Sequence, residues 1–116
     1  MTNRETLVCV QIEDEAALPN LDDILKVDHV DVFFVGPNDL SQSMGYPGNP
    51  KAPPVKQAIE TAFSKIRAAG KAPGTPGTTE NIRDVLSQGV FYTYTHVPKL
   101  LGAATQEFFK KTGIIR

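Results

Sequence analysis

Apolar residues along the chain gather in short runs that are separated by longer segments of mixed polarity. Three runs rich in β-branched and aromatic residues cover residues 7–12 (LVCVQI), 30–35 (VDVFFV) and 90–95 (VFYTYT), and a weaker one covers residues 71–75 (KAPGT). Near-continuous apolar runs of this length are typical of parallel strands that are covered on both faces. The pattern therefore predicts four strands.

The segments between the runs repeat apolar residues at helical spacing. One helix is expected from Pro53 to a stop at Gly70, and another from an N-cap at Thr78 to a stop at Gly89. Pro19 interrupts the segment after the first strand, so a short helical turn is expected there, followed by a new helix. The apolar stripe of a last helix is formed by Leu100, Leu101, Ala104 and Phe108.

The helix that follows Pro19 has a typical start signal. Asn20 is its expected N-cap, and Asp22 and Asp23 stand in its first turn, where negative charge is favourable. Strand and helix thus alternate four times, which predicts an α/β fold with a parallel sheet and right-handed crossovers. Two architectures fit this order: an open doubly wound sheet, or half of a (β/α)8 barrel, whose usual length is about 250 residues.

Composition narrows the class of protein. With 116 residues, of which 41% are hydrophobic, residues 1–116 are expected to form a single domain. A net charge of -1 argues against a nucleic-acid partner, and no apolar run approaches the roughly 20 residues of a membrane span. The single cysteine, Cys9, makes no internal disulfide, which favours the reducing cytoplasm; we expect it to be a buried, inert thiol.

Carboxylates follow the first two strands at the end where parallel folds place their sites. Gln11 and Glu13 are two residues apart and therefore share one face of the first strand. Asp39 follows a Gly-Pro turn after the second strand. Two such carboxylates suit a divalent cation such as Mg²⁺, Mn²⁺ or Co²⁺. The alternative, that these acidic residues only cap helices, stays open on residue type and spacing alone.

Several motifs together are more specific than either carboxylate. They are Gln-Ile-Glu at 11–13, Gly-Pro-Asn-Asp-Leu-Ser at 36–41, Met-Gly-Tyr at 44–46, Gly-Asn-Pro at 48–50 and Lys-Ala-Pro-Gly at 71–74. From residue 7 to about residue 109 the chain resembles the C-terminal half of the HpcH/HpaI aldolase and citrate lyase family. The resemblance implies half of a (β/α)8 barrel and a metal-dependent pyruvate aldolase, which cleaves 4-hydroxy-2-oxo acids to pyruvate and an aldehyde.

The resemblance also implies roles for individual residues. Glu13 and Asp39 would be the metal ligands, and Gln11 would lie beside bound pyruvate. Lys71 would lie at the opposite, stability-related end of the barrel rather than act as a Schiff-base lysine. The 2-oxo acid would be bound by Gln11, Gly36, Pro37, Asn38 and Asp39, with backbone groups of residues 36–39 facing its carboxylate.

The family's acid–base histidine and substrate-binding arginine belong to the N-terminal half of the barrel, and no motif of this chain matches them. We therefore expect the isolated chain to lack full activity, and to need a complementary N-terminal half. A homo-oligomer is also expected, because full-length relatives form trimers and hexamers and exchange their last helix. His96 is expected to cap a helix or pack locally instead of replacing the missing histidine, and His29 to be a solvated turn residue.

Two alternative functions are weighed against the aldolase. The first is a non-catalytic subunit or truncated relic that keeps the metal site. The second is a receiver-like signalling domain, favoured by length and by the acidic cluster at residues 13–15. That fold needs a fifth strand, and it needs an aspartate at the end of its third strand. The third expected strand here, residues 71–75, contains no aspartate.

Overall fold

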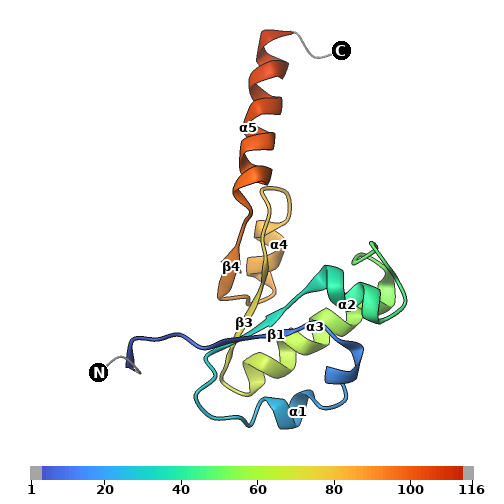
Figure 1. Ribbon diagram of the computed structural model, residues 1–116, viewed down its shortest axis with the longest axis vertical. Helices are drawn as coiled ribbons and strands as arrows, with labels where there is room; N and C mark the ends of the chain where they lie inside the picture. Colours follow the sequence, from blue (N-terminus) through green and yellow to red (C-terminus); the bar gives the residue numbers. More distant parts are fainter. Residues whose placement is uncertain (1–3, 114–116) are drawn as a thin grey trace.

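A computed structural model describes residues 4–113 as one parallel four-stranded sheet with helices in the connections (Figure 1). All four strands expected from the apolar runs are present. They are β1 (Cys9–Ile12), β2 (Val32–Val35), β3 (Ala72–Pro76) and β4 (Tyr92–Tyr94). The helical elements are η2 (Glu15–Ala17), α1 (Leu21–Ile24), α2 (Pro37–Ser43), α3 (Pro53–Ala68), α4 (Ile82–Ser87) and α5 (Val97–Thr112).

The strands lie in sequence order, β1-β2-β3-β4. A doubly wound sheet reverses its strand order at a switch point, whereas a (β/α)8 barrel adds each strand beside the last. The observed order therefore favours half a barrel over the open sheet. The register sets Gln11 opposite Phe34, Phe34 opposite Gly74, and Gly74 opposite Tyr92, so these residues form one level across the sheet.

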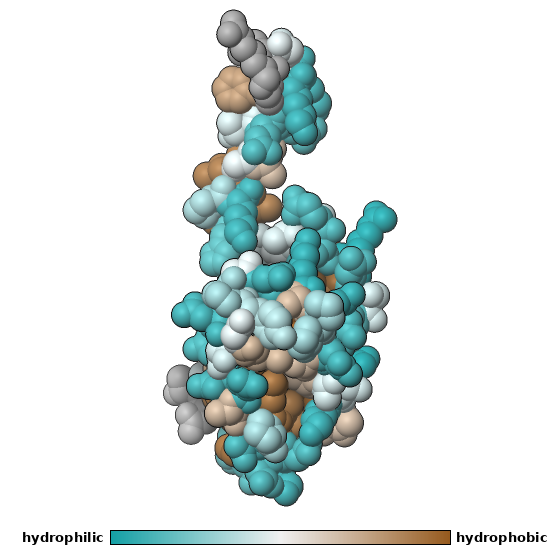
Figure 2. Space-filling view, turned by 90° about the vertical axis from the view of Figure 1, so that its right-hand side faces the viewer, coloured by the Kyte–Doolittle hydropathy of each residue, from teal (hydrophilic) through white to brown (hydrophobic). Residues whose placement is uncertain are grey.

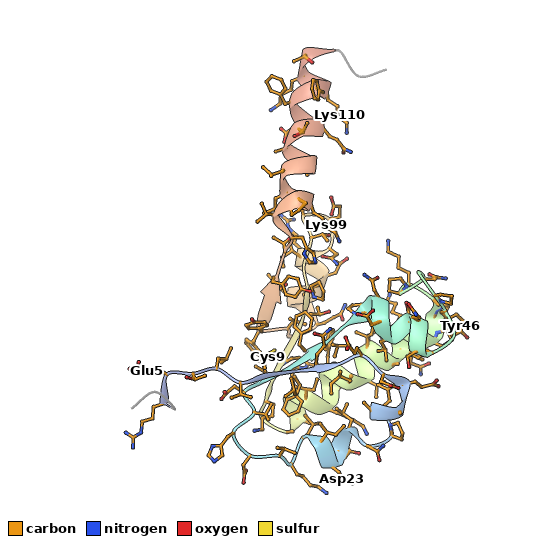
Figure 3. The ribbon with its side chains drawn as sticks, viewed as in Figure 1. Glu5, Cys9, Asp23, Tyr46, Lys99 and Lys110 are labelled. Carbon is orange, nitrogen blue, oxygen red and sulfur yellow. The ribbon has the colours of Figure 1, made fainter. Side chains whose placement is uncertain are left out.

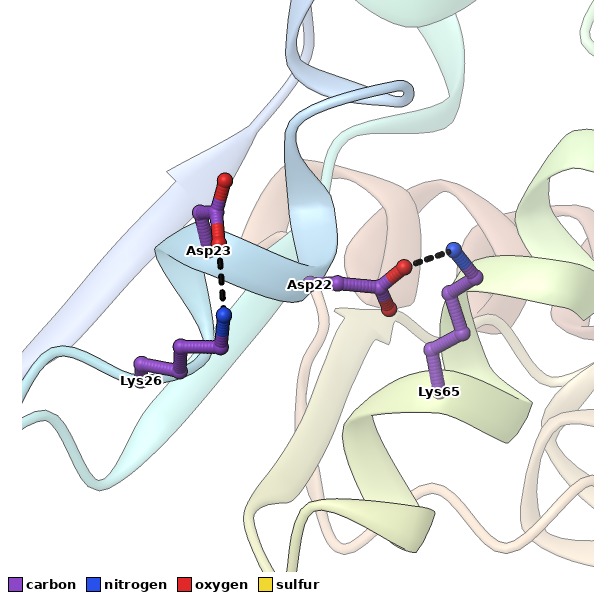
Figure 4. Close-up of polar contacts among 4 residues, drawn as sticks. All are labelled: Asp22, Asp23, Lys26 and Lys65. Carbon is purple, nitrogen blue, oxygen red and sulfur yellow. Dashed lines mark hydrogen bonds and ion pairs between the residues drawn. The ribbon is translucent and has the colours of Figure 1, made fainter.

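The hydrophobic core lies between the sheet and helices α1, α2 and α3. Phe33 and Val35 of β2 are fully buried there. Because successive side chains of a strand point to opposite faces, these two face the helices and Phe34 faces away from them. An ion pair of 2.8 Å between Lys65 of α3 and Asp22 of α1 joins the two helices at the surface (Figure 4). The core cluster consists of Ile12, Leu21, Leu25, Val30, Phe33, Val35, Leu40, Ala62, Phe63, Ile66, Val85 and Val90.

The expectation that the strands are covered on both faces holds for β2 and for the centre of β3, but not for β1 and β4. Every residue of β2 is buried, whereas every residue of β4 is exposed, and in β1 only Ile12 is buried. The expectation of a buried Cys9 is therefore wrong, because the residue is exposed on an edge strand. Partial burial of its sulfur nevertheless raises the pKa of the thiol above its ordinary value.

Aromatic rings occupy the face of the sheet that is turned away from the core. The Phe34 ring stacks on Tyr94 with centroids 5.2 Å apart and meets the edge of Tyr92 at 6.2 Å. Gly74 lies between them on β3, where a Cβ atom would stand 2.8 Å from Cδ2 of Phe34. The glycine therefore leaves room for rings from β2 and β4 to cross the strand between them.

One helix start differs from the sequence expectation, and one expected N-cap residue forms no capping bond with its side chain. Thr78 does not cap α4, which begins at Ile82 after an N-cap residue Asn81. Thr78 and Asn81 instead bond to each other, and Oδ1 of Asn81 accepts from the backbone N–H of Thr78 at 2.7 Å. Asn20 does stand at the N-cap of α1, but its side chain donates back to the carbonyl of Ala16. In both cases the polar side chain closes the preceding turn rather than the helix.

Helix α5 projects away from the rest of the molecule (Figure 1). None of its residues is buried. Figure 2 shows hydrophobic side chains on one side of this helix and hydrophilic ones on the other. Its large exposed hydrophobic residues are Val97, Leu100, Leu101, Phe108 and Phe109. Within residues 4–113, no helix is both long enough and apolar enough to cross a membrane.

Candidate functional site

Gln11 and Glu13 meet at the C-terminal end of β1. The amide Nε2 of Gln11 donates a hydrogen bond of 2.6 Å to Oε2 of Glu13. The two side chains were expected on one face of the strand, and the bond agrees with that placement. The amide holds one oxygen of the Glu13 carboxylate, so the direction of the whole carboxylate is set by its neighbour on the strand.

Gly36 lies directly beside this pair. Its backbone N–H donates to the carbonyl of Ile12 at 3.0 Å, which continues the pairing of β1 with β2. A Cβ atom at this position would lie 2.9 Å from Nε2 of Gln11 and 3.5 Å from Oε2 of Glu13. A side chain here would therefore displace the hydrogen-bonded pair, which gives the glycine of the Gly-Pro turn a physical reason.

Asp39 stands in the first turn of α2, three residues after Gly36. Leu40 and Ser41 are fully buried and hold this short helix against the core, while Asn38 and Asp39 remain exposed. The hydroxyl of Ser41 donates to the carbonyl of Asn38 at 2.6 Å and fixes the turn. The segment 36–41 therefore presents Asp39 to solvent at the end of the sheet where Glu13 also emerges.

Two contacts join the loops that carry Glu13 and Asp39. Oγ of Ser43 accepts from the backbone N–H of Glu15 at 2.8 Å and donates to Oδ1 of Asp14 at 3.2 Å. From the sequence, Asp14 stood out only as part of the acidic cluster at residues 13–15, and Ser43 did not stand out. They lie 29 residues apart, and nothing in the periodicity links them. In Figure 3, β1 runs from the labelled Cys9 toward α2, beyond which Tyr46 lies.

The donors offered at this edge are carboxylate oxygens, which suit Mg²⁺, Mn²⁺ or Co²⁺ better than a soft metal ion. Both residues are exposed, so each can contribute oxygens to a cation that also keeps water and substrate. In the part of the chain covered by residues 4–113, no group of three or more His, Cys, Asp or Glu side chains is placed to hold a metal ion.

The other residues considered lie elsewhere. The ammonium group of Lys71 donates to the carbonyl of Val30 at 2.8 Å, at the N-terminal end of the sheet, which agrees with a structural role. His96 stands at the N-cap position of α5 without capping it, and its ring packs edge-on against Tyr94, so the expected local packing is found. His29 is exposed just before β2, with a left-handed φ of 61° typical of a turn.

Residues 1–91 match the family model for HpcH/HpaI aldolase/citrate lyase. This chain belongs to that family. The HpcH/HpaI model covers β1, β2, β3 and the loops that carry Glu13 and Asp39, so the edge described above lies within the match.

Two curated relatives of the HpcH/HpaI chain carry the same name. The 4-hydroxy-2-oxo-heptane-1,7-dioate aldolase of Shigella sonnei (strain Ss046) is 44% identical over 106 residues, which cover 90% of this chain and 40% of that protein. The protein of that name from Salmonella paratyphi A (strain ATCC 9150 / SARB42) is 54% identical over 74 residues, which cover 64% of this chain and 28% of that protein. The chain therefore spans less than half the length of either relative.

Solved structures agree with the fold. A HpcH/HpaI aldolase/citrate lyase family protein from Burkholderia cenocepacia J2315 superposes with a TM-score of 0.87 at 27% identity, covering 94% of this chain and 43% of that one. The citrate synthase SbnG gives a TM-score of 0.80 at 27% identity, covering 97% and 48%. The chain thus has the fold of part of a TIM-barrel-like aldolase, as the strand order indicated.

Proposed function

We propose that this chain is the metal-binding and oxo-acid-binding half of a pyruvate aldolase that cleaves 4-hydroxy-2-oxo acids. Residues 1–116 would form its C-terminal half-barrel domain. The observation that carries the proposal is the hydrogen bond from Gln11 to Glu13. The bond lies beside Gly36, the residue at which the segment that bears Asp39 begins. The names of the Shigella and Salmonella relatives support the substrate class.

In this proposal Glu13 and Asp39 hold one divalent cation, Mg²⁺, Mn²⁺ or Co²⁺, in keeping with the general use of such a metal in the family. When bound, the cation acts as a Lewis acid that polarises the keto group of the substrate and stabilises the negative charge developing as the carbon–carbon bond breaks. The two carboxylates also offset the positive charge of the cation. Gln11 keeps Glu13 in the orientation that binding needs.

Gln11 and residues 36–39 bind the 2-oxo acid. The first backbone N–H groups of a helix have no carbonyl partner within it, and in α2 these include the N–H groups of Asn38 and Asp39. Pro37 has no N–H and instead fixes the backbone at the start of the helix. The N–H groups of Asn38 and Asp39 would face the carboxylate of pyruvate, and Gln11 would lie at its side.

Aldol cleavage also needs a group that moves a proton and a cation that fixes the acid substrate. The histidine and arginine that do this by the family resemblance would come from a complementary N-terminal half, or from another copy. The chain alone would then bind the cation and the oxo acid without cleaving substrate at an enzymatic rate. Only slow loss of a methyl proton from pyruvate, with buffer as acceptor, is expected of it.

The experiment is deuterium uptake by the methyl group of pyruvate in D₂O, followed by NMR with Mg²⁺. The chain with Mg²⁺ should exchange the methyl protons faster than Mg²⁺ in buffer, and the excess should vanish in Glu13→Gln and in Asp39→Asn. Glu60→Gln removes a carboxylate from an exposed position on α3 and should leave exchange unchanged. Exchange at the buffer rate with the unaltered chain would overturn the proposal.

A further inference from the structure

The loop after β1 and the helix after β2 are joined by one serine hydroxyl. Oγ of Ser43 accepts from the backbone N–H of Glu15 at 2.8 Å and donates to Oδ1 of Asp14 at 3.2 Å. A single side chain of α2 therefore contacts both a backbone group and a side chain of the other loop. The loop carries Glu13 and the helix carries Asp39, so the contact links the two segments that bear the carboxylates assigned to the cation.

On the β1 side the contact fixes the residue next to Glu13. Asp14 is extended, with φ −113° and ψ 135°, and its Oδ1 also accepts from the backbone N–H of Ala16 at 2.9 Å. Asp14 therefore caps η2 and bonds Ser43 with the same oxygen. The backbone that follows Glu13 is held in place from two directions, which restricts where the Glu13 carboxylate can point.

On the α2 side the contact acts through one turn of helix. Ser43 is the last residue of α2, and Asp39 precedes it by four residues. Residues four apart lie on the same face of a helix, so Asp39 is on the face of α2 that Ser43 turns toward the loop after β1. Holding Ser43 therefore sets the rotation of α2, and with it the direction of Asp39.

We propose that Asp14 and Ser43 are positioning residues that keep Glu13 and Asp39 at the separation required to share one divalent cation. The inference rests on the metal site proposed above. Neither residue belongs to the hydrophobic core cluster, and the contacts of Ser43 with Glu15 and with Asp14 are exposed. Their removal should therefore loosen the site without unfolding the chain.

The test is the affinity for Mn²⁺, measured by electron paramagnetic resonance of the free ion, together with the thermal midpoint of each protein. Ser43→Ala should weaken Mn²⁺ binding by about tenfold, the lower end of the range for groups that orient metal ligands. Ser43→Thr keeps the hydroxyl and should restore the affinity of the unaltered chain. The matched control is Ser87→Ala, because Ser87 is likewise the exposed last residue of a short helix.

Two variants of Asp14 form a second arm of the experiment, which distinguishes the hydrogen bonds of this side chain from its negative charge. Asp14→Asn keeps an oxygen that can accept from Ala16 and Ser43, so it should bind Mn²⁺ more tightly than Asp14→Ala. If the charge of Asp14 were what mattered, the two variants would lose affinity equally. Equal loss would overturn the positioning role.

The remaining outcomes distinguish a failure of the positioning role from a failure of the metal site. If Glu13→Ala weakens binding but Ser43→Ala binds Mn²⁺ like the unaltered chain, the metal site stands and the positioning role falls. The same holds if Ser43→Ala lowers the thermal midpoint well below that of Ser87→Ala and Ser43→Thr restores neither stability nor affinity. If Glu13→Ala and Asp39→Ala bind Mn²⁺ as tightly as the unaltered chain, the metal site itself is wrong and the inference falls with it.

Discussion

Nε2 of Gln11 lies 2.6 Å from Oε2 of Glu13, and Gly36 leaves the space that this contact occupies. The relationship joins the ends of two strands, because Gln11 lies in β1, Glu13 directly follows it, and Gly36 directly follows β2. It also explains why a glycine precedes the helix that carries Asp39. The absence of a side chain at Gly36 is therefore as necessary for this arrangement as the polar side chains of Gln11 and Glu13.

Gly36→Ala tests that relationship. The backbone at Gly36, with φ −92° and ψ 95°, is open to alanine, so the fold should persist. The new methyl group would meet the flexible amide of Gln11 and push it from Glu13, and Mn²⁺ binding should weaken by about tenfold. Gly102→Ala, on α5 with nothing within 4 Å of the added atom, is the control and should leave binding unchanged. Unaltered Mn²⁺ affinity in Gly36→Ala would contradict the account.

The sequence predicted the strands because their apolar runs are distinct from the helical segments. The run at 71–75 was the least typical, yet β3 covers Ala72–Pro76, since parallel pairing with β2 on one side and β4 on the other supplies what its own residues do not suggest. The structure narrows the first strand from 7–12 to Cys9–Ile12. The first pair of the β1–β2 ladder is Cys9 with Val32. The start of β1 is therefore set by pairing with β2 and not by apolar content.

Contacts between distant loops were beyond prediction from the sequence. Glu13 and Asp39 could be proposed as ligands because the carboxyl ends of parallel strands are where such folds place their sites. No such rule applies to Asp14 and Ser43, because a serine hydroxyl meets an aspartate only after two loops are placed in space. The burial of Cys9 was predicted wrongly for a related reason. Burial depends on which elements cover a face of the sheet, and the residues of the strand itself do not indicate that.

Helix α5 leads to a prediction on assembly. Leu101 and Phe108 are 63% and 65% exposed on a helix that buries no residue of its own. Apolar surface of this kind favours association, so we expect a dimer or larger assembly by light scattering. Leu101→Asp and Phe108→Asp should shift the mass toward the monomer, while Gln106→Asp on the opposite side should not. A strict monomer at high concentration would contradict the expectation.

Cys9 provides a prediction on pH. Burial of the sulfur raises the pKa of the thiol, so the folded chain holds this proton to higher pH than the unfolded chain does. The rate of alkylation by iodoacetamide should therefore reach its midpoint at higher pH in the folded protein than in urea. By linkage, the small stabilisation is present below the unfolded pKa and is lost as pH rises through the folded one. A midpoint equal to or below that in urea would contradict this assignment.

The proposed division of the catalytic groups predicts how activity depends on a second polypeptide. The purified 116-residue chain should not cleave a 4-hydroxy-2-oxo acid at an enzymatic rate, because groups that act as a unit lose most of the rate when some are absent. Mixing it with an N-terminal half from a relative should restore release of pyruvate, measured by a coupled assay. Failure to restore cleavage, with both halves folded, would favour a non-catalytic subunit that keeps the metal site. Rapid turnover by the chain alone would contradict the division, and His96 would then be the first residue to substitute.

The most direct measurement is calorimetric titration of Mn²⁺ into the chain, its Glu13→Ala and Asp39→Ala variants, and the control Glu60→Gln. The account predicts one weak site, because two protein ligands leave most of the coordination to water and substrate. Each alanine variant should lose that site while Glu60→Gln keeps it, and pyruvate should tighten binding only where the site is intact. Equal binding by the unaltered chain and both alanine variants would contradict the assignment of Glu13 and Asp39.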